Sequence, residues 1–315
     1  MALIKHLPTE PKFNFIGRHR LTLALSAVMV VLSLGLFTTA GLNYGVDFRG
    51  GVMLEVRTEG PAADLSELRS RLGALGLGQV SLQSLDEPTD VLINIQRQEG
   101  GDEAQNAAVE VVKTALADTV VEYRRTEFVG PKVGGELKQA ALIATLLSLA
   151  AIALYIWFRF EWQFSLAALL ALTHDVVTTI GFFVIMGLEF NLASVAAILT
   201  IAGYSINDTV VVFDRVRESL RKYKKVPVGE VLNMALNATL SRTLLTSVTT
   251  LLALIALSVF GGHVIRGFSL ALIWGVIIGT YSSIGVATPL LMLMNLRHSQ
   301  VAKPQPEGSG EAAAS

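Results

Sequence analysis

The residues best suited to chemistry in this chain are charged side chains inside apolar segments. Asp208, next to Asn207, lies in an otherwise apolar run of membrane-spanning length, and that run ends in a dense cluster of charges. A carboxylate at such a depth is costly unless it faces the protein interior, finds a partner or carries a proton. The pattern therefore predicts a transport protein rather than a soluble catalyst.

Two further charged residues extend this candidate proton path. Arg242 lies a few residues into a neighbouring span of opposite direction, so it is expected at a depth similar to that of Asp208. Protonation of Asp208 would release Arg242 and let the helices repack, although a static pair, or an arginine reaching for the membrane surface, also fits. Asp175 lies near the middle of another span, beside His174. It is either a member of the path with Asp208, Arg242 and Asn207, or a buried carboxyl held protonated by local hydrogen bonds.

Enzymatic chemistry finds little support in the residues. The chain has no cysteine, which excludes disulfides and zinc–thiolate sites. An intramembrane aspartyl protease would use Asp175 and Asp208, but no Gly-X-Gly precedes the second aspartate. We therefore expect no enzyme, no cofactor and no metal.

The composition is that of a membrane protein. Hydrophobic residues make up 52% of the chain and charged residues 16%, and the mean hydropathy is +0.54, which is too apolar for a soluble domain of this length. Apolar runs predict six transmembrane helices, at about 21–42, 139–158, 163–188, 190–213, 240–260 and 267–296, the last long enough to tilt or bend. A cleaved signal peptide is an alternative for the first run, but its length favours an uncleaved anchor.

The distribution of Lys and Arg predicts the orientation in the membrane. These residues gather before the first span, after the fourth and after the sixth, so both termini are expected in the cytoplasm. Three cytoplasmic segments follow: residues 1–20, a basic loop near 214–239 close to anionic lipid, and a disordered tail at 297–315. Residues 226–239 are expected to form a short interfacial helix before the fifth span.

A segment of different character, residues 43–136, separates the first span from the five-helix region at 137–296, and it is expected outside the cytoplasm. Its periodicity predicts the order β-α-β-β-α-β, a ferredoxin-like α+β domain; the elements are at 52–58, 62–77, 80–85, 91–96, 104–116 and 120–128. About 16 acidic residues against about 9 basic ones argue against nucleic-acid binding. The expected fold is a polytopic α-helical membrane protein with this one exterior domain between helices 1 and 2.

Glycine-rich segments flank the exterior domain on both sides. Gly50 and Gly51 lead into it, while Gly130, Pro131, Gly134 and Gly135 lead out of it. Glycine tolerates positive φ and proline cannot continue a helix, so both segments are candidate hinges, with static turns as the alternative. As hinges, they would let the domain move as a rigid body in response to the membrane proton switch.

Five segments in order resemble the SecF family, within the resistance-nodulation-division superfamily: GLNYGVDFRGG at 41–51, VGPKVGGEL at 129–137, THD at 173–175, GYSINDTVVVFDRVRE at 203–218 and SRTLLTSVTTLLALIALSVFGG at 241–262. The resemblance implies a subunit of bacterial Sec-dependent protein export in the cytoplasmic (inner) membrane. It implies a complex with SecD beside the SecYEG channel, where proton flow drives exterior-domain movements that pull an unfolded polypeptide forward. It also implies that Asp208 and Arg242 belong to the proton path.

Two other functions stay open at this point. A proton-driven small-molecule or lipid exporter of the same superfamily shares the exterior loop and the intramembrane aspartate. Such exporters usually carry two six-span halves and two large exterior domains on one chain, whereas this chain has one of each. A pure assembly scaffold gives no reason for Asp208.

Overall fold

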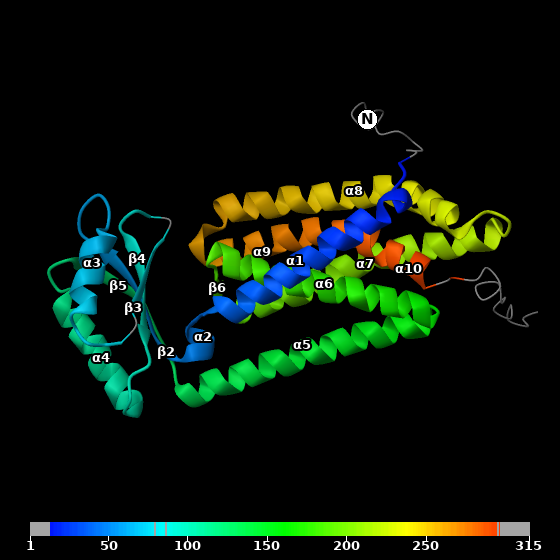
Figure 1. Ribbon diagram of the computed structural model, residues 1–315. Helices are drawn as coiled ribbons and strands as arrows, with labels where there is room; N and C mark the ends of the chain where they lie inside the picture. The colour runs from blue at the N-terminus through cyan, green and yellow to red at the C-terminus, as the bar shows by residue number, and fades with distance from the viewer. Residues whose placement is uncertain (1–12, 79, 86, 295, 297–315) are drawn as a thin grey trace, which may run out of the picture.

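The structure is a computed structural model that describes residues 13–78, 80–85, 87–294 and 296. It consists of a bundle of long helices with an α+β domain at one end (Figure 1). Most of the predicted N-terminal segment and the whole tail at 297–315 lie outside the described residues.

Six helices in the described part of the chain are long and apolar enough to cross a membrane, as predicted. They are α1 (His19–Thr39), α5 (Pro131–Arg159), α6 (Trp162–Met186), α7 (Leu192–Lys222), α8 (Val228–Phe260) and α9 (Gly262–Ser282). The last of them continues through a π turn, η3 (Ser283–Ala287), into α10 (Thr288–Leu293). The span that was expected to tilt or bend is therefore interrupted at the π turn.

The helices extend further than the apolar runs indicate. The segment 214–239, predicted as a loop with a separate interfacial helix, is helical except at residues 223–227. The first turns of α8 stay helical because they bury an apolar face in the bundle core, through Val231, Leu232, Ala235 and Leu236. Likewise α5 begins at Pro131 rather than near 139, since proline is well accommodated in the first turn of a helix.

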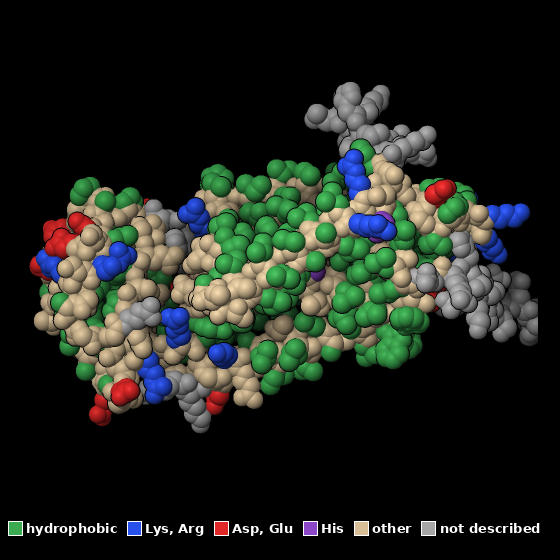
Figure 2. Space-filling model, viewed as in Figure 1, with side chains coloured by type: hydrophobic (Ala, Val, Ile, Leu, Met, Phe, Trp, Pro, Cys, Tyr) green, Lys and Arg blue, Asp and Glu red, His purple; other side chains and the backbone are tan. Residues whose placement is uncertain are grey.

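The bundle has a central and a peripheral set of helices. In their most apolar windows, α6, α7 and the α9 span are 50%, 50% and 61% buried, whereas α1, α5 and α8 are only 11%, 6% and 11% buried. Hydrophobic side chains cover the visible face of the bundle, and charged ones gather at its two ends and on the α+β domain (Figure 2). The peripheral helices thus present the apolar surface that lipid or a membrane partner would cover.

The central helices α7 and α9 approach each other closely through glycine. Gly275 and Gly279 lie four residues apart on α9 and face α7. A Cβ atom at position 275 would overlap the Ile201 side chain, and one at position 279 would lie 3.0 Å from the Cβ atom of Ser205. Small residues at four-residue spacing are a common means of close helix packing in membranes.

The α+β domain has the predicted ferredoxin-like topology. Its elements are β2 (Gly51–Thr58), α3 (Leu65–Gly73), β3 (Val80–Ser84), β4 (Asp90–Gln96), α4 (Gly101–Ala115) and β5 (Val120–Val129). The strands form one antiparallel sheet in the order β3-β4-β2-β5, so β4 is inserted between β2 and β3. The apolar sides of the two helices pack on this sheet around buried Leu54, Ile93 and Val112.

Replacing Gly275 by alanine should force α7 and α9 apart. Overpacking of this kind typically costs about 1–3 kcal/mol, so the thermal denaturation midpoint of the purified full chain should fall. Gly267 is the matched control, because it lies on the same helix without positive φ, and a Cβ atom there would meet nothing within 4 Å. Gly267→Ala should leave the midpoint unchanged or raise it slightly; an equal loss in both variants would contradict the packing account.

Candidate functional site

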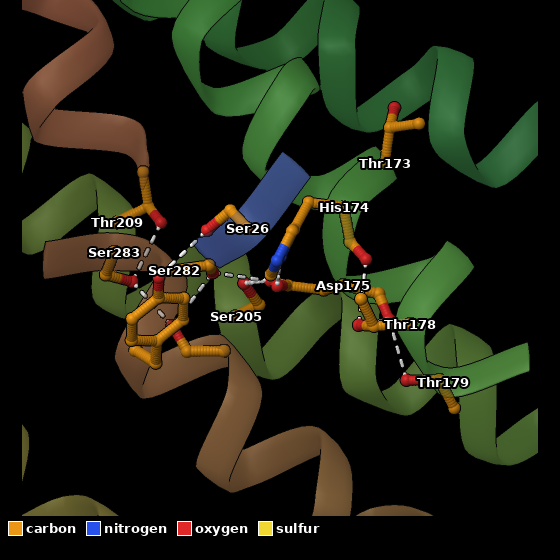
Figure 3. Close-up of polar contacts among 12 residues, drawn as sticks. Ser26, Thr173, His174, Asp175, Thr178, Thr179, Ser205, Thr209, Ser282 and Ser283 are labelled. Carbon is orange, nitrogen blue, oxygen red and sulfur yellow. Dashed lines mark hydrogen bonds and ion pairs between the residues drawn. The ribbon is translucent and has the colours of Figure 1, made fainter. Parts of the chain in front are cut away.

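The centre of the bundle is organised around the carboxylate of Asp175 on α6, which is fully buried. Its Oδ2 atom accepts hydrogen bonds from the hydroxyls of Ser205 on α7, at 2.5 Å, and Ser282 at the end of α9, at 2.7 Å. Its Oδ1 atom lies 2.9 Å from Nδ1 of His174. One carboxylate therefore connects the three central helices (Figure 3).

His174 leaves one ring nitrogen available inside the bundle. The side chain is buried, and its Nε2 atom has no hydrogen-bond partner among the described residues. The ring lies 6.1 Å, centroid to centroid, from that of Tyr281. The Tyr281 hydroxyl donates to the Thr22 carbonyl on α1 and is 2.9 Å from the Ser26 hydroxyl. The imidazole next to Asp175 is thus a buried group with one nitrogen that makes no hydrogen bond, which is rare for a residue with a purely structural role.

Asp208 on α7 is half-buried and connects α7 to α8. Its Oδ1 atom accepts a hydrogen bond of 2.5 Å from the hydroxyl of Thr243, while its buried Oδ2 atom has no hydrogen-bond partner in the described structure. Ser283 lies near this carboxylate and is hydrogen-bonded to the hydroxyl of Thr209, at 3.0 Å. Gain or loss of a proton at Asp208 would therefore change contacts on two sides of α7.

The surroundings of the two carboxylates meet at the π turn. Ser282 binds Asp175, and the next residue, Ser283, binds Thr209 beside Asp208. On α7, Ser205 and Thr209 lie one helical turn apart: Ser205 donates to Asp175, and Thr209 is hydrogen-bonded to Ser283 (Figure 3). π turns occur frequently at functional sites. The sequence analysis did not single out Ser282 or Ser283; the available signal was a pair of adjacent hydroxyls inside an apolar span.

Two predicted members of the proton path lie outside this network. The Arg242 side chain is exposed on the surface of α8, and no ion pair joins it to Asp208 within the described chain; its neighbour Thr243 makes that contact instead. The guanidinium is still close enough to act electrostatically on Asp208. Asn207 is exposed as well, on the surface of α7. The structure thus places Asp175 and Asp208 near adjacent serines of the last span and leaves the side chains of Arg242 and Asn207 exposed.

The predicted hinges differ in conformation. Gly50 and Gly51 have φ angles of 72° and 134°, which favour glycine, and a Cβ atom at Gly51 would overlap the Ile95 carbonyl of β4. Gly130 has extended backbone and precedes α5, but Pro131 is already helical.

The two remaining glycines of the exit segment, Gly134 and Gly135, lie in the first turns of α5. A Cβ atom at Gly134 would come within 3.3 Å of the Asp47 carbonyl in the short helix α2 (Val46–Arg49). The structure therefore restricts a hinge on this side to Gly130, and the hinge itself stays a prediction.

The α+β domain also contacts the bundle directly, at the connection between α6 and α7. Here β6 (Glu189–Phe190) pairs in parallel with β1 (Asn43–Tyr44). The Asp47 carboxylate accepts a hydrogen bond of 2.9 Å from the backbone of Leu192, in the first turn of α7. Asn94 of β4 donates a long hydrogen bond of 3.5 Å to the Glu189 carboxylate. The domain and the segment that leads into it therefore touch the connection between the helices that carry Asp175 and Asp208, and the first turn of α7.

Glu189 is the titratable group of this junction. Burial raises the pKa of its carboxyl above the ordinary value, and the nearby charge of Asp47 raises it further. Arg49 and the hydrogen bond from Asn94 act in the opposite direction. Because the charged form is disfavoured, this junction is stabilised at low pH relative to high pH.

Six spans, two carboxylates with hydroxyl partners inside the bundle and an appended ferredoxin-like domain define a polytopic α-helical membrane protein. Two family models match the chain: "Protein export membrane protein SecD/SecF, C-terminal" at residues 109–297 and "SecD/SecF GG Motif" at residues 35–62. The chain belongs to the SecD/SecF family of protein export membrane proteins.

Relatives and solved structures agree with this assignment. The protein translocase subunit SecF of Rickettsia bellii is 43% identical over 92% of this chain and 96% of its own length. The protein translocase subunit SecDF of Brucella abortus is 42% identical over 98% of this chain but only 40% of its own length.

Two crystal structures of SecDF match most of this chain. That of a translocon-associated SecDF from Thermus thermophilus is 37% identical with a TM-score of 0.82, over 91% of this chain and 39% of that one. A SecDF in a super-membrane-facing form matches 90% of this chain and 39% of its own at the same identity, with a TM-score of 0.67. This chain thus spans about two fifths of the solved SecDF chains.

Proposed function

We propose that the chain is the SecF-type accessory subunit of Sec-dependent protein translocation, which uses the proton gradient to promote export of unfolded polypeptides across the bacterial inner membrane. The observation that carries the proposal is that two intramembrane carboxylates lie against adjacent serines of the last span in a chain of this family: Ser282 donates to Asp175, and Ser283, hydrogen-bonded to Thr209, lies near Asp208. Both termini are then cytoplasmic and the α+β domain faces the exterior, as the distribution of Lys and Arg predicts. SecYEG and the moving polypeptide are the partners on that side.

SecD is the proposed partner within the membrane. The exposed side chains of Arg242 and Asn207 face away from this bundle, on surfaces that would be costly to leave against lipid. In the SecDF relatives, the matching region is part of a longer chain that includes a SecD portion, which supports a partner covering these residues. In this arrangement Arg242 lies at the interface with SecD, and the proton path runs between the two subunits rather than within this chain.

Proton coupling begins, in this proposal, at Asp208. Neutralising its carboxylate weakens the hydrogen bond from Thr243 and removes the attraction of Arg242, so α7 and α8 are free to shift. Because Ser205 and Thr209 hold α7 to Asp175 and to the π turn, the shift passes to α6 and α9. A change of protonation at Asp208 is therefore passed on as a movement of helices as well as by transfer of a proton.

Movement of the exterior domain follows from the junction at Glu189. A shift of α6 and α7 moves their connection, which is paired with β1 and bonded to Asn94 of the domain. Gly50 and Gly51 then take up the change of angle. The two SecDF crystal structures match this chain at equal identity but with TM-scores of 0.82 and 0.67, which supports more than one conformation in the family.

Asp208→Asn should abolish proton-dependent export without unfolding the chain or releasing SecD. Asparagine keeps the size and one acceptor oxygen for Thr243 but cannot carry the titratable proton. Export of a reporter in cells expressing only the variant should fall to the rate measured without a proton gradient. Glu103→Gln, the same change at an exposed site of α4, is the control and should export normally. Normal export by Asp208→Asn would refute the role of this carboxylate.

Arg242→Lys should impair export although the charge is kept, because lysine lacks the planar five-donor fork needed for a geometric partner. Complementation of a strain lacking the protein is the measurement. Arg266→Lys, at an exposed arginine in the first turns of α9, should complement fully. Full complementation by Arg242→Lys would instead identify Arg242 as an arginine that extends to the membrane surface.

A cross-link between the α+β domain and its membrane base should stop export. Asn94 and Glu189 are suitable sites for two cysteines joined by a reducible bifunctional thiol reagent, since their side chains touch across the junction and the chain has no cysteine of its own. Treatment of the double cysteine variant with the reagent should arrest export, and reduction should restore it, while the single cysteine variants should export normally after the same treatment. Export at an unchanged rate in the cross-linked state would show that the domain works without moving.

A further inference from the structure

The end of the bundle opposite the α+β domain contains a cavity that the proposed function does not use. It has a volume of about 1000 Å³ and lies between the turn that joins α5 to α6 and the last turns of α7. The cavity exists because α7 continues to Lys222, well past the point at which the α5–α6 pair reverses. One side of its wall is therefore formed by the end of an apolar span, and the other by the charged end of α7.

The apolar half of the wall is placed for contact with lipid. Phe158 is 95% exposed and Tyr155 is 62% exposed, and both line the cavity. Trp157 and Trp162, on either side of the turn, are exposed as well. Exposed aromatic residues gather where a membrane meets water. The cavity thus opens at the depth at which acyl chains give way to headgroups.

The charged half of the wall carries an excess of positive charge. Its cations outnumber its carboxylates, with Arg159, Arg217, Arg221 and Lys222 against Glu161, Asp214 and Glu218. Each carboxylate also lies beside a guanidinium: Arg159 is 2.8 Å from Asp214, Arg217 is 3.4 Å from Glu161, and Arg215, outside the wall, is 2.7 Å from Glu218.

One further donor is present in this wall. The Nε–H group of Arg217 is buried and has no hydrogen-bond partner in the described structure. A planar guanidinium binds phosphate oxygens well, and a buried N–H group without a partner is costly. The wall therefore offers donors and positive charge to an anion. Its carboxylates have cationic neighbours, but the buried Oε2 atom of Glu161 has no hydrogen-bond partner in the described structure.

We propose that this cavity binds the headgroup of an anionic membrane phospholipid. The phosphate contacts the last turns of α7, at Arg217, Arg221 and Lys222, and the acyl chains follow α5 past Phe158 and Tyr155. A soluble phosphate would use only the charged half of the wall. A zwitterionic lipid would place its ammonium group among carboxylates that guanidinium groups already neutralise. The bound lipid would join the end of α7, the helix of Asp208, to the α5–α6 turn.

Native mass spectrometry of the full chain can test this site, with dioleoyl-phosphatidylglycerol, dioleoyl-phosphatidylcholine or inorganic phosphate as the added ligand. The wild type should retain the glycerol lipid at least tenfold more than the choline lipid. The double variant Arg221→Gln, Lys222→Gln should lose that preference, since each cation near an anionic lipid contributes a factor of about five. Both residues are exposed at the end of a helix, so the variant should keep the wild-type melting midpoint in lipid-free detergent.

The matched control is Lys224→Gln, Lys225→Gln, which removes the same charge from the adjoining connection outside the cavity wall. It should retain the glycerol lipid as the wild type does. An equal loss in both double variants would reduce the effect to general surface charge and overturn the site. Equal retention of both lipids, or displacement of the lipid by millimolar inorganic phosphate, would overturn the assignment to an anionic phospholipid.

Discussion

A carboxylate inside a membrane-spanning bundle must find its hydrogen-bond donors within the protein, because lipid offers none. The arrangement of the central helices depends on how Asp175 finds them. Two hydroxyls and an imidazole reach it from α7, α9 and α6 itself. They can do so only because Gly275 and Gly279 let α7 and α9 approach closely. The close packing of α7 against α9 and the hydrogen bonding of Asp175 therefore depend on each other.

The sequence was a good guide to the elements and a poor one to their contacts. Hydropathy length and periodicity predicted the six spans and the order of the ferredoxin-like domain, because both depend on local patterns. The polar end of α7 was missed because the end of the apolar run was equated with the end of the helix, although Arg, Glu, Leu and Lys all have high helix propensity. An apolar face beyond it, at Val231 and Leu232, keeps the start of α8 helical. Asp175 and Asp208 could be singled out from the sequence because a carboxylate inside an apolar run is conspicuous wherever its side chain points.

What could not be predicted is which side chains face each other across helices. Apolar runs do not specify rotation about the helix axis, so Arg242 was expected beside Asp208 although Thr243 occupies that position. The serines at 282 and 283 have no signal of their own until the π turn aligns them. The junction at Glu189 was likewise invisible, since its partners lie 95 residues apart or more along the chain. The structure thus adds the rotation of each helix about its axis and the contacts between segments that are far apart along the chain.

The π turn has one more consequence. A π turn is an α-helix with one inserted residue, and such a defect behaves like a dislocation in a crystal: it can travel along the helix without the ends being unwound. Displacement by one residue would rotate the segment it passes by roughly 100°, the angle between successive residues of an α-helix. Each residue of that segment would then take the azimuth of its neighbour, so that Ser283 would take that of Ser282 and the two carboxylates would meet different side chains. The last span can thereby change its contacts while both of its ends stay in place, without tilting and without sliding along its axis.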